Sequence, residues 1–316
     1  WTIAEGDKLN WIKEISARPV GNRDLLTETT KRLMLLVDLL GGGSRCYKTL
    51  WHFVSGLGLN NPIENGMAWH HTLGVPYLPG ASIKGLVRAW VEQWVNDLSR
   101  AEIDRIFGPR GNKQEKADEN NGQKTTKHGS SIIFFDALPL KPVQLTADVM
   151  TPHYQKYYNG NEPPADWLAP NPIPFLTVKD NQTFLFNVAP RKRNNDEQKS
   201  DCKLILKWLD QALLNIGAGA KTAAGYGRFT RCNTSENELK ATMQQSKEEK
   251  TKKTLTSIHP QLRGPIADQM IKDQYDADPE EFLGILKNKW IFTLQAAETS
   301  TDDQQTIAKL LKNWFQ

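Results

Sequence analysis

Residues 217–229 read Gly-Ala-Gly-Ala-Lys-Thr-Ala-Ala-Gly-Tyr-Gly-Arg-Phe. It holds four glycines, two cations and two aromatic rings, and it follows a helical pattern. Because glycine costs backbone entropy, such a cluster indicates a sharp turn or the very close approach of another group. Lys221 and Arg228 suggest that this group is anionic, for example a phosphate cradled by backbone N–H groups. The alternative is a helix C-terminal stop followed by a strand.

Two common nucleotide-binding motifs do not fit this stretch. A P-loop needs the pattern G-x-x-x-x-G-K-[ST] between a strand and a helix, whereas here Lys221 and Thr222 follow Gly-Ala-Gly-Ala and a helical pattern. A dinucleotide-binding fingerprint needs a strand that leads into its glycines. No strand pattern leads into the stretch, so neither class is indicated.

A second candidate for anion binding is the segment Pro-Gly-Ala-Ser-Ile-Lys-Gly-Leu-Val-Arg at residues 79–88. Apolar residues recur at helical spacing within and after it, and Ser82 is placed to cap this helix. Lys84 and Arg88 lie one turn apart on the polar face. Gly85, in the expected first turn, would let a phosphate approach a helix start that favours anions. The alternative is a solvated helix face with two ordinary cations.

Aromatic and basic residues gather in a third stretch, residues 148–158, which reads Asp-Val-Met-Thr-Pro-His-Tyr-Gln-Lys-Tyr-Tyr. Its three tyrosines, one histidine and one lysine are typical of a surface that stacks on bases and contacts the backbone of a single nucleic-acid strand. A strand end whose rings cover the core is the alternative.

The order of elements predicts a mixed domain with helical extensions. Strand, helix, two strands, further strand material, helix and strand follow one another, as in the β-α-β-β-α-β pattern of a ferredoxin-like unit. We therefore expect an α+β, ferredoxin-like (RRM-like) fold with insertions at residues 45–234, and helical segments at 1–44 and 235–316. Residues 33–40 fit a helix or a buried strand. The elements are expected at residues 48–54, 83–98, 131–138, 140–150, 175–179, 183–188, 202–216 and 226–232.

The composition limits the possible functions without choosing one. The chain has 316 residues, 39% of them hydrophobic, and a formal net charge of +4, which permits nucleic-acid binding but does not argue for it. The three cysteines are widely separated and form no C-x-x-C pair, so we expect no zinc ribbon or other metal site and a reducing cytoplasm. Without a secretory segment or a long apolar run, no membrane association is expected. No motif points to a cofactor.

Residues 75–88, 148–154 and 217–229 together resemble the RAMP superfamily of CRISPR effector subunits in their order and spacing. Within it, they are most similar to the sixth-subunit family of the type III-B (Cmr) effector complex. The glycine-rich stretch is shared across RAMP proteins. The Pro-Gly-x-Ser-x-Lys-Gly segment narrows the match to effector subunits, and the Asp-Val-x-Thr-Pro-His-Tyr segment narrows it further. The resemblance extends from residue 45 to residue 232.

This resemblance implies a non-catalytic, RNA-binding subunit of an antiviral complex, which helps to cap the end near the 3′ region of the guide RNA. Its partners would be the CRISPR guide RNA, the target RNA, the repeated backbone subunit and a neighbouring cap subunit. Binding would be mostly electrostatic, and base pairing would read the sequence. The residues expected to contact RNA are Ser82, Lys84, Gly85, Arg88, His153, Tyr154, Gly217, Gly219, Lys221, Thr222, Tyr226 and Arg228.

Two catalytic functions and one structural function stay open. A RAMP-type endoribonuclease that processes CRISPR precursor RNA would use a general base, but the sequence gives none of His52, His70, His71 and His153 a convincing catalytic partner. Cleavage of target RNA through Asp148 and a metal ion would need further carboxylates, and no second carboxylate is expected nearby. The third possibility is a pure assembly protein whose basic residues face protein partners.

Overall fold

The computed structural model describes residues 5–61, 66–110, 129–151, 154–160, 163, 165 and 171–257. The chain divides into two compact units, residues 1–238 and 239–316. All of the candidate site residues belong to the first unit. The domain boundaries expected after residues 44 and 234 stay a prediction.

The first unit combines helices with short and long strands. Among the described residues, the helices are α1 (Glu5–Ser16), α2 (Arg23–Leu39), α3 (Gly80–Trp94), α4 (Arg100–Phe107), α5 (Gln155–Tyr158), α6 (Asp196–Asn215) and α7 (Asn233–Ser257), the last of which continues into the second unit. The strands are β1 (Gly43–Thr49), β2 (Trp69–His70), β3 (Val75–Pro76), β4 (Ile132–Phe134), β5 (Leu138–Pro139), β6 (Leu145–Met150), β7 (Ile173–Val178), β8 (Thr183–Pro190) and β9 (Phe229–Arg231). The chain is thus a mixed α/β protein.

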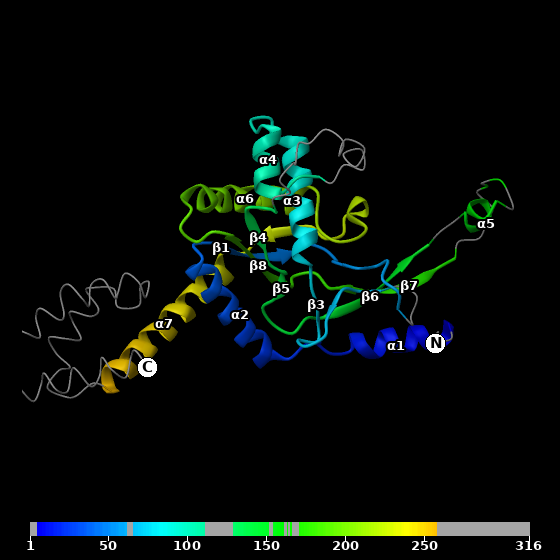
Figure 1. The fold of residues 1–316 in the computed structure, drawn as a ribbon. Coiled ribbons are helices and arrows are strands. Elements are labelled where there is room, and N and C mark those ends of the chain that lie inside the picture. The colour runs from blue at the N-terminus through cyan, green and yellow to red at the C-terminus, as the bar shows by residue number, and fades with distance from the viewer. Residues whose placement is uncertain are drawn as a thin grey trace, which may run out of the picture. The chain divides into compact units, whose positions relative to one another are not determined.

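The main sheet is antiparallel and joins segments that lie far apart in the sequence (Figure 1). Its strands run in the order β4-β8-β1-β9, and β5 also pairs with β8. In the centre of the sheet, Cys46 of β1 is in register with Leu185 of β8. Because β1 covers residues 43–49, the strand expected at residues 48–54 was placed too late, and its second half lies outside the main sheet.

Residues 50–54 leave the main sheet and cross to a separate hairpin made of β6 and β7. Phe53 forms an isolated antiparallel bridge with Val178 of β7, with backbone hydrogen bonds of 3.0 and 2.7 Å. The helix α5 lies at the far end of the hairpin, away from the main sheet (Figure 1). The crossing places His52 beside Asp148 of β6.

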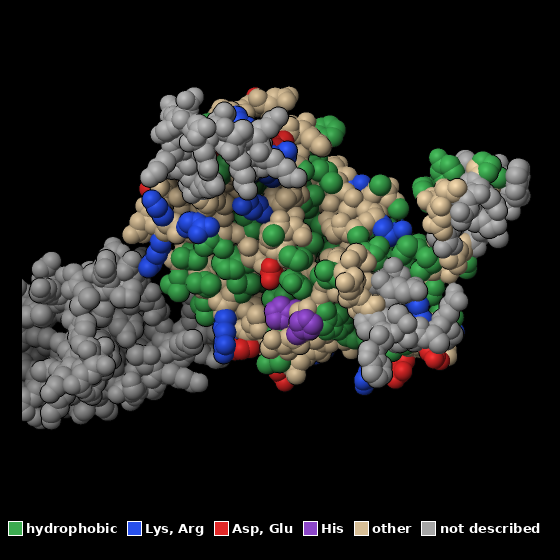
Figure 2. Space-filling view, turned by 45° about the vertical axis from the view of Figure 1, so that its right-hand side comes forward, with side chains coloured by type: hydrophobic (Ala, Val, Ile, Leu, Met, Phe, Trp, Pro, Cys, Tyr) green, Lys and Arg blue, Asp and Glu red, His purple; other side chains and the backbone are tan. Residues whose placement is uncertain are grey.

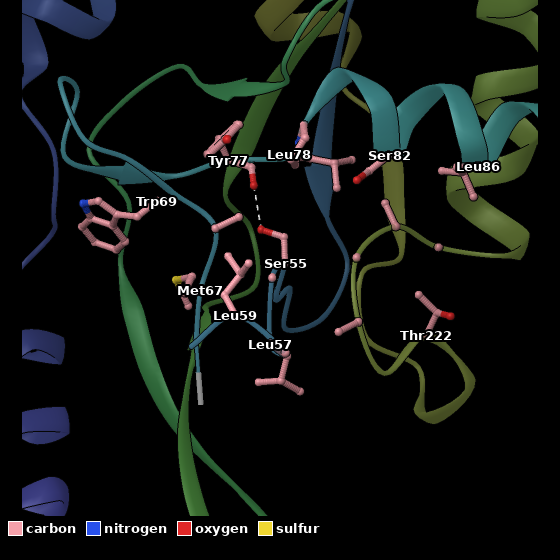
Figure 3. A pocket seen from close by; sticks show the side chains of 18 of the residues that line it. Ser55, Leu57, Leu59, Met67, Trp69, Tyr77, Leu78, Ser82, Leu86 and Thr222 are labelled. Atoms are coloured by element: carbon pink, nitrogen blue, oxygen red, sulfur yellow. Dashed lines mark hydrogen bonds between the residues drawn. The ribbon is translucent and has the colours of Figure 1, made fainter. Parts of the chain in front are cut away.

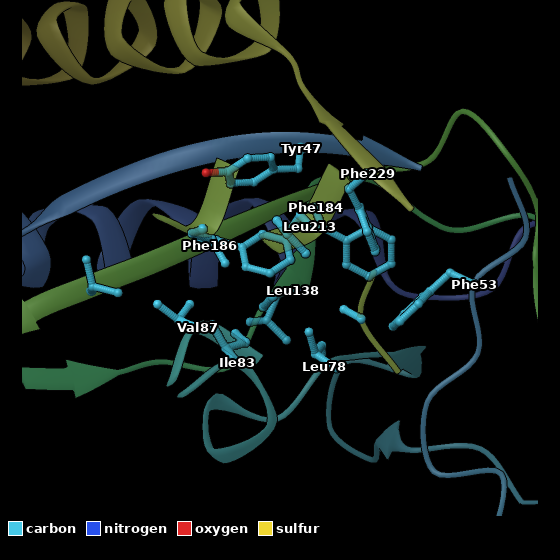
Figure 4. Packing of buried hydrophobic residues seen from close by; sticks show 14 of the residues in the cluster. Tyr47, Phe53, Leu78, Ile83, Val87, Leu138, Phe184, Phe186, Leu213 and Phe229 are labelled. Carbon is cyan, nitrogen blue, oxygen red and sulfur yellow. The ribbon is translucent and has the colours of Figure 1, made fainter. Parts of the chain in front are cut away.

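The core lies between the main sheet and the helices α3 and α6. These helices pack on each other and on the sheet, and α2 packs on β1 and β8; in Figure 1, α3 and α6 lie above these strands and α2 lies below them. Five buried aromatic rings contact one another edge to face at centroid separations of 5.1–5.8 Å (Figure 4). Burying one such ring stabilises a fold by about 1.5–3 kcal/mol. The rings are those of Tyr47, Phe53, Phe184, Phe186 and Phe229.

Local capping sets where two of the helices begin. The side chain of Asn22 caps α2, and residues 33–39 belong to this helix, which settles the choice between helix and strand there. The helix α3 begins at Gly80, with Pro79 at its N-cap. The expectation that Ser82 caps α3 is therefore wrong, because Ser82 already lies inside the first turn.

Candidate nucleic-acid interface

The glycine-rich stretch, residues 217–229, ends the helix α6 and leads into β9. Gly217 N–H donates to the carbonyl of Ala212 in α6 at 2.9 Å, so the helix-stop interpretation of the backbone is confirmed. Three backbone hydrogen bonds of 2.8 Å then tie the stretch to residues 50–54. They run from Ala220 N–H to Val54 O, from Gly227 N–H to His52 O, and from Leu50 N–H to Arg228 O.

The packing of the chain itself requires two of these glycines. Gly219 has a φ of +89° and Gly227 a φ of +68°, both in the left-handed region that favours glycine. A Cβ atom on Gly219 would overlap the carbonyl oxygen of Val54, and one on Gly227 would overlap that of Ala218. The glycine cluster predicts the close approach of another group. At these two positions that group is a carbonyl of the protein itself.

Lys221 is held in an unusual backbone conformation. Its φ and ψ are 58° and 30°, a left-handed conformation that costs a residue with a Cβ atom about 1–2 kcal/mol. Its Nζ atom lies 5.6 Å from the ring centroid of Phe175 and 6.0 Å from that of Tyr226. No described carboxylate pairs with Lys221, so its charge is free to interact with an anion.

Asp148, His52 and Tyr226 form a hydrogen-bonded cluster where the hairpin meets the glycine-rich stretch. The Tyr226 hydroxyl donates to Asp148 Oδ2 at 2.5 Å, and His52 Nδ1 lies 3.0 Å from the same oxygen. Val149 N–H donates to Asp148 Oδ1 at 2.8 Å. No catalytic partner for His52 was evident from the sequence, and the structure places this residue beside Asp148. The signal that could have found the pair is absent from the sequence, because 96 residues separate His52 from Asp148.

The cluster shifts the acidity of both of its acids. Burial alone would raise the pKa of Asp148, but the hydrogen bonds from Tyr226, His52 and Val149 N–H outweigh it and hold the pKa below its ordinary value of 3.8. Burial first, and then the hydrogen bond to Asp148 and the charge of that carboxylate, raise the pKa of Tyr226 to about 12. At neutral pH the Asp148 carboxylate is therefore ionised and accepts a hydrogen bond from the protonated Tyr226 phenol.

Asp148→Asn is expected to lower the free energy of unfolding at pH 7 by about 1.5–3 kcal/mol, the usual contribution of a hydrogen bond to a charged group. Because the folded-state pKa of Asp148 is lowered, its contribution is present above pH 3.8 and is lost as the pH falls through the folded-state value. The stability difference between wild type and variant should therefore shrink below pH 3.8. Urea unfolding across acidic pH measures this difference, and a difference independent of pH would contradict a role for the carboxylate charge.

A groove of about 1090 Å³ lies between α3, the glycine-rich stretch and residues 55–61. In Figure 3, Ser82 and Leu86 line it from α3, and Thr222 lines it from the glycine-rich stretch. Ser55 Oγ donates to the carbonyl of Tyr77 at 2.6 Å, which ties two of the lining segments together. The groove brings together four of the residues expected to contact RNA: Ser82, Gly217, Gly219 and Thr222.

The two cations of α3 have different surroundings. Arg88 Nε and Nη2 pair with Glu92 and Asp104 at 2.9 Å, and 12% of its side chain is exposed, so Arg88 joins α3 to α4 and its charge is neutralised. Lys84 pairs with no described carboxylate. Burial, followed by the charges of Arg88 and Arg191, lowers the pKa of Lys84. A bound anion would relieve the repulsion between Lys84 and these two arginines. Arg88, whose charge is already neutralised, is not part of the interface proposed below.

Gly85 lies in the second turn of α3 rather than in the expected first turn, because the helix begins at Gly80. A Cβ atom on Gly85 would meet nothing within 4 Å. The fold therefore does not require a glycine here, although glycine inside a helix costs about 1 kcal/mol relative to alanine. The surface at Gly85 is open to a ligand.

The aromatic residues of the third stretch lie on the hairpin rather than at the groove. Tyr157 and Tyr158 in α5 are exposed, and their ring centroids are 5.5 Å apart. Tyr154 precedes α5, and its carbonyl accepts the N–H of Tyr158 at 3.0 Å. His153 lies outside the described residues.

The basic side chains do not form one continuous patch on the face shown in Figure 2. There, lysine and arginine side chains lie in separate groups with hydrophobic side chains between them. Arg228 Nη1 donates to the carbonyl of Leu214 at 3.3 Å, which holds this guanidinium near the end of α6. Lys84 and Lys221 are therefore the strongest of the sequence-derived cation candidates for phosphate contact.

Neither a metal centre nor a membrane span is found in the part of the chain that the structure describes. No three side chains of His, Cys, Asp or Glu converge there. No helix there is both long and apolar enough to cross a bilayer. The ring of His70 accepts the N–H of Leu73 through Nδ1 at 3.3 Å, which is a structural role within a turn.

The sequence profile of the RAMP superfamily matches residues 33–230. The chain belongs to the RAMP superfamily. The matched region contains the main sheet, the hairpin, α3, α6 and the glycine-rich stretch as far as β9. Both walls of the groove and the Asp148 cluster thus lie within the RAMP part of the chain.

Two named proteins are similar to this chain. Over 231 residues it is 31% identical to the CRISPR system Cmr subunit Cmr6 of Pyrococcus furiosus, which covers 58% of this chain and 66% of that protein. Over 168 residues it is 27% identical to the CRISPR system CMR subunit Cmr6 of Saccharolobus solfataricus, which covers 52% of this chain and 48% of that protein. The chain thus spans less than two thirds of the length of each relative.

The fold is also similar to a chain in a solved assembly, the cryo-EM structure of the type III-B Cmr-beta bound to cognate target RNA. The TM-score is 0.56 at 20% sequence identity, over 72% of this chain and 71% of that chain. At this identity the likeness concerns the fold alone. It agrees with the family assignment made from the sequence profile.

Proposed function

We propose that this RAMP protein is a non-catalytic, RNA-binding subunit of a type III-B CRISPR effector complex. The similarity to two Cmr6 proteins supports membership of such a complex. In this proposal the subunit works in the cytoplasm and caps the end of the complex near the 3′ region of the guide RNA, beside the repeated backbone subunit and a neighbouring cap subunit. Its ligands are the guide RNA and the guide–target duplex.

The observation that carries RNA contact is that α3 and the glycine-rich stretch meet at one groove. Ser82 of α3 and Thr222 of the glycine-rich stretch both line the groove (Figure 3). Lys84 lies on another face of α3, beside Arg88 and Arg191, and Lys221 directly precedes Thr222. Hydroxyl groups and lysine side chains without carboxylate partners are the donors that hold nucleic-acid phosphates.

The surroundings of Asp148 support a structural role for this residue. Its carboxylate already accepts from Tyr226 and from Val149 N–H and contacts His52, so three groups of the protein occupy it. The rings of Trp51 and His52 stack, which covers one face of the imidazole. An endoribonuclease that uses His52 as its general base is the alternative, and the 3.0 Å contact with Asp148 is the observation that favours it.

We further infer that the central unit is ferredoxin-like. The elements β1, α3, β4, β8, α6 and β9 follow one another as β-α-β-β-α-β. The sheet order β4-β8-β1-β9 places the first and third strands of this pattern side by side in the centre. On this proposal, the helical segments expected at residues 1–44 and 235–316 are extensions that contact neighbouring subunits.

The double variant Lys84→Ala/Lys221→Ala is expected to weaken guide RNA binding by at least about tenfold, because each lysine contributes a charge-assisted hydrogen bond to a phosphate. The slope of log affinity against log salt should fall by about 1.4, which corresponds to two fewer contacts with single-stranded RNA. RNA occupancy and affinity of the purified complex, measured across a salt series, test this expectation.

A matched control removes the same charge elsewhere. Lys203 and Lys207 are exposed on α6, so the double variant Lys203→Ala/Lys207→Ala changes the net charge equally without touching the groove. Equal losses in both double variants would show that only the overall charge matters. Wild-type RNA occupancy in Lys84→Ala/Lys221→Ala would contradict the proposed interface.

The purified chain by itself is expected to leave guide precursor and target RNA intact, because Tyr226 and Val149 N–H occupy the Asp148 carboxylate and the Trp51 ring covers one face of His52. Gel analysis of end-labelled RNAs after incubation with the chain measures this. Cleavage that disappears in His52→Ala while folding is kept would replace the non-catalytic proposal by the endoribonuclease alternative.

A further inference from the structure

Trp51 presents an aromatic ring to solvent next to the Asp148 cluster. Its relative exposure is 52%, and its ring stacks on that of His52 with centroids 4.6 Å apart and an angle of 13° between the planes. Single exposed hydrophobic residues are common on protein surfaces and need no explanation by themselves. Here the exposed ring is a large π surface that already lies parallel to a second ring.

The backbone around Trp51 is fixed on both sides. Leu50 N–H donates to the carbonyl of Arg228, and the carbonyl of His52 accepts the N–H of Gly227, both at 2.8 Å. The two residues that flank Trp51 are thus tied to the glycine-rich stretch. A fixed backbone reduces the conformational entropy that a binding surface loses when a ligand stacks on it.

The ring beneath Trp51 is fixed as well. His52 Nδ1 lies 3.0 Å from Asp148 Oδ2, which in turn accepts the Tyr226 hydroxyl at 2.5 Å. The imidazole therefore cannot turn without breaking a contact of the cluster. One face of the Trp51 ring therefore lies against His52, which is held by Asp148 and Tyr226. The exposed part of the Trp51 ring is left for a further planar group.

A cation adjoins the Asp148 cluster that holds His52 in place. Lys221 Nζ is 6.0 Å from the ring centroid of Tyr226, which is itself 6.2 Å from that of His52. The backbone of Arg228 is bonded to Leu50, the residue before Trp51, whereas its guanidinium donates to the carbonyl of Leu214 near the end of α6. Proteins hold single-stranded nucleic acid with exposed aromatic rings that stack on bases and with cations that contact the phosphates, and Trp51 supplies such a ring.

We propose that Trp51 is a stacking platform for one unpaired nucleobase of the bound RNA. The proposal rests on the RNA-binding function proposed above and adds a site for a base to the phosphate contacts at the groove. Every base has a π face, so the platform does not select sequence, and it acts on nucleotides that are not paired in a duplex.

The experiment uses the purified effector complex and RNAs that carry 2-aminopurine at successive positions, because stacking quenches the fluorescence of this base. One position is expected to be quenched in the wild type and to regain fluorescence in Trp51→Ala. The affinity of Trp51→Ala for RNA should fall by about 5- to 150-fold, the usual effect of removing one stacked ring. Trp51→Phe should restore part of both signals, since a smaller ring still stacks.

Trp94→Ala is the matched control. Trp94 is 64% exposed on α3 and stacks on Trp90 with centroids 5.6 Å apart, so it is also an exposed tryptophan on a second ring, but it belongs to the end of α3 rather than to the segment that is bonded to the glycine-rich stretch. This variant should keep the quenching and the affinity of the wild type.

The salt series separates stacking from charge. Trp51→Ala should lower the affinity with an unchanged slope of log affinity against log salt, whereas Lys221→Ala should lower the slope. Unchanged quenching and affinity in Trp51→Ala would overturn the stacking proposal while the RNA-binding function stands. Loss of a protein subunit from the Trp51→Ala complex, with RNA quenching intact, would overturn it in favour of a protein contact. A wild-type complex without RNA would overturn both proposals.

Discussion

Gly227→Ala is expected to destabilise the fold by about 2–5 kcal/mol, the sum of the cost of a left-handed conformation and the cost of overpacking. The φ of Gly227 is +68°, and a Cβ atom there would overlap the carbonyl oxygen of Ala218. Ala218 cannot move away freely, because its N–H donates to the carbonyl of Gly227 at 2.8 Å. The two ends of the glycine-rich stretch, which meet at Ala218 and Gly227, would have to separate.

The same change should also reduce RNA binding. Gly227 N–H donates to His52 O, so the shift would loosen the segment that carries His52 and the groove wall formed by Gly217 and Gly219. Urea unfolding gives the stability, and RNA titration of the folded fraction gives the affinity. A loss of affinity without a loss of stability would show that the backbone at Gly227 contacts the ligand rather than supports the site.

Gly225→Ala provides the comparison within the same stretch. Gly225 has a φ of +92°, but a Cβ atom there would meet nothing within 4 Å. Only the conformational cost of about 1–2 kcal/mol is expected. Equal destabilisation of Gly225→Ala and Gly227→Ala would show that the carbonyl of Ala218 yields easily, and it would contradict the packing explanation.

The glycine-rich stretch shows what a pattern of residues can and cannot predict. The helix that ends before it and the strand that follows it are local features, and both were predicted from spacing and composition. The identity of the close neighbour is not local. At Gly219 that neighbour is the carbonyl of Val54, a residue more than one hundred and fifty positions away, and the spacing of glycines is the same whether the neighbour is a phosphate or a carbonyl.

Long-range pairs explain the other differences between expectation and structure. Lys84 and Arg88 look equivalent on a helical wheel, but Arg88 reaches Asp104 of the next helix, and Lys84 reaches no described carboxylate. His52 meets its partner only in the folded chain. The strand β1 ends at Thr49, and the following residues cross to β6, which carries Asp148. In both cases the partner is chosen by how two elements pack, which the sequence of either element alone does not contain.

Arg105→Ala is expected to lower the free energy of unfolding by about 3–5 kcal/mol, the usual cost of leaving a buried charge without its partner. Arg105 of α4 holds Asp201 of α6 with two bonds, of 2.5 Å to Oδ2 and 3.1 Å to Oδ1. The Asp201 side chain is 5% exposed, so water cannot replace the guanidinium. Urea unfolding of the full chain measures the loss.

Two further variants show where such a loss comes from. Arg100→Ala removes another ion-paired arginine of α4, but its side chain is 58% exposed, so the cost should stay below about 1 kcal/mol. Adding Asp201→Asn to Arg105→Ala removes the stranded charge and should recover part of the lost stability. If the double variant is no more stable than Arg105→Ala, the loss reflects missing packing between α4 and α6 rather than an unpaired carboxylate, because the truncated stem of Arg105 is common to both.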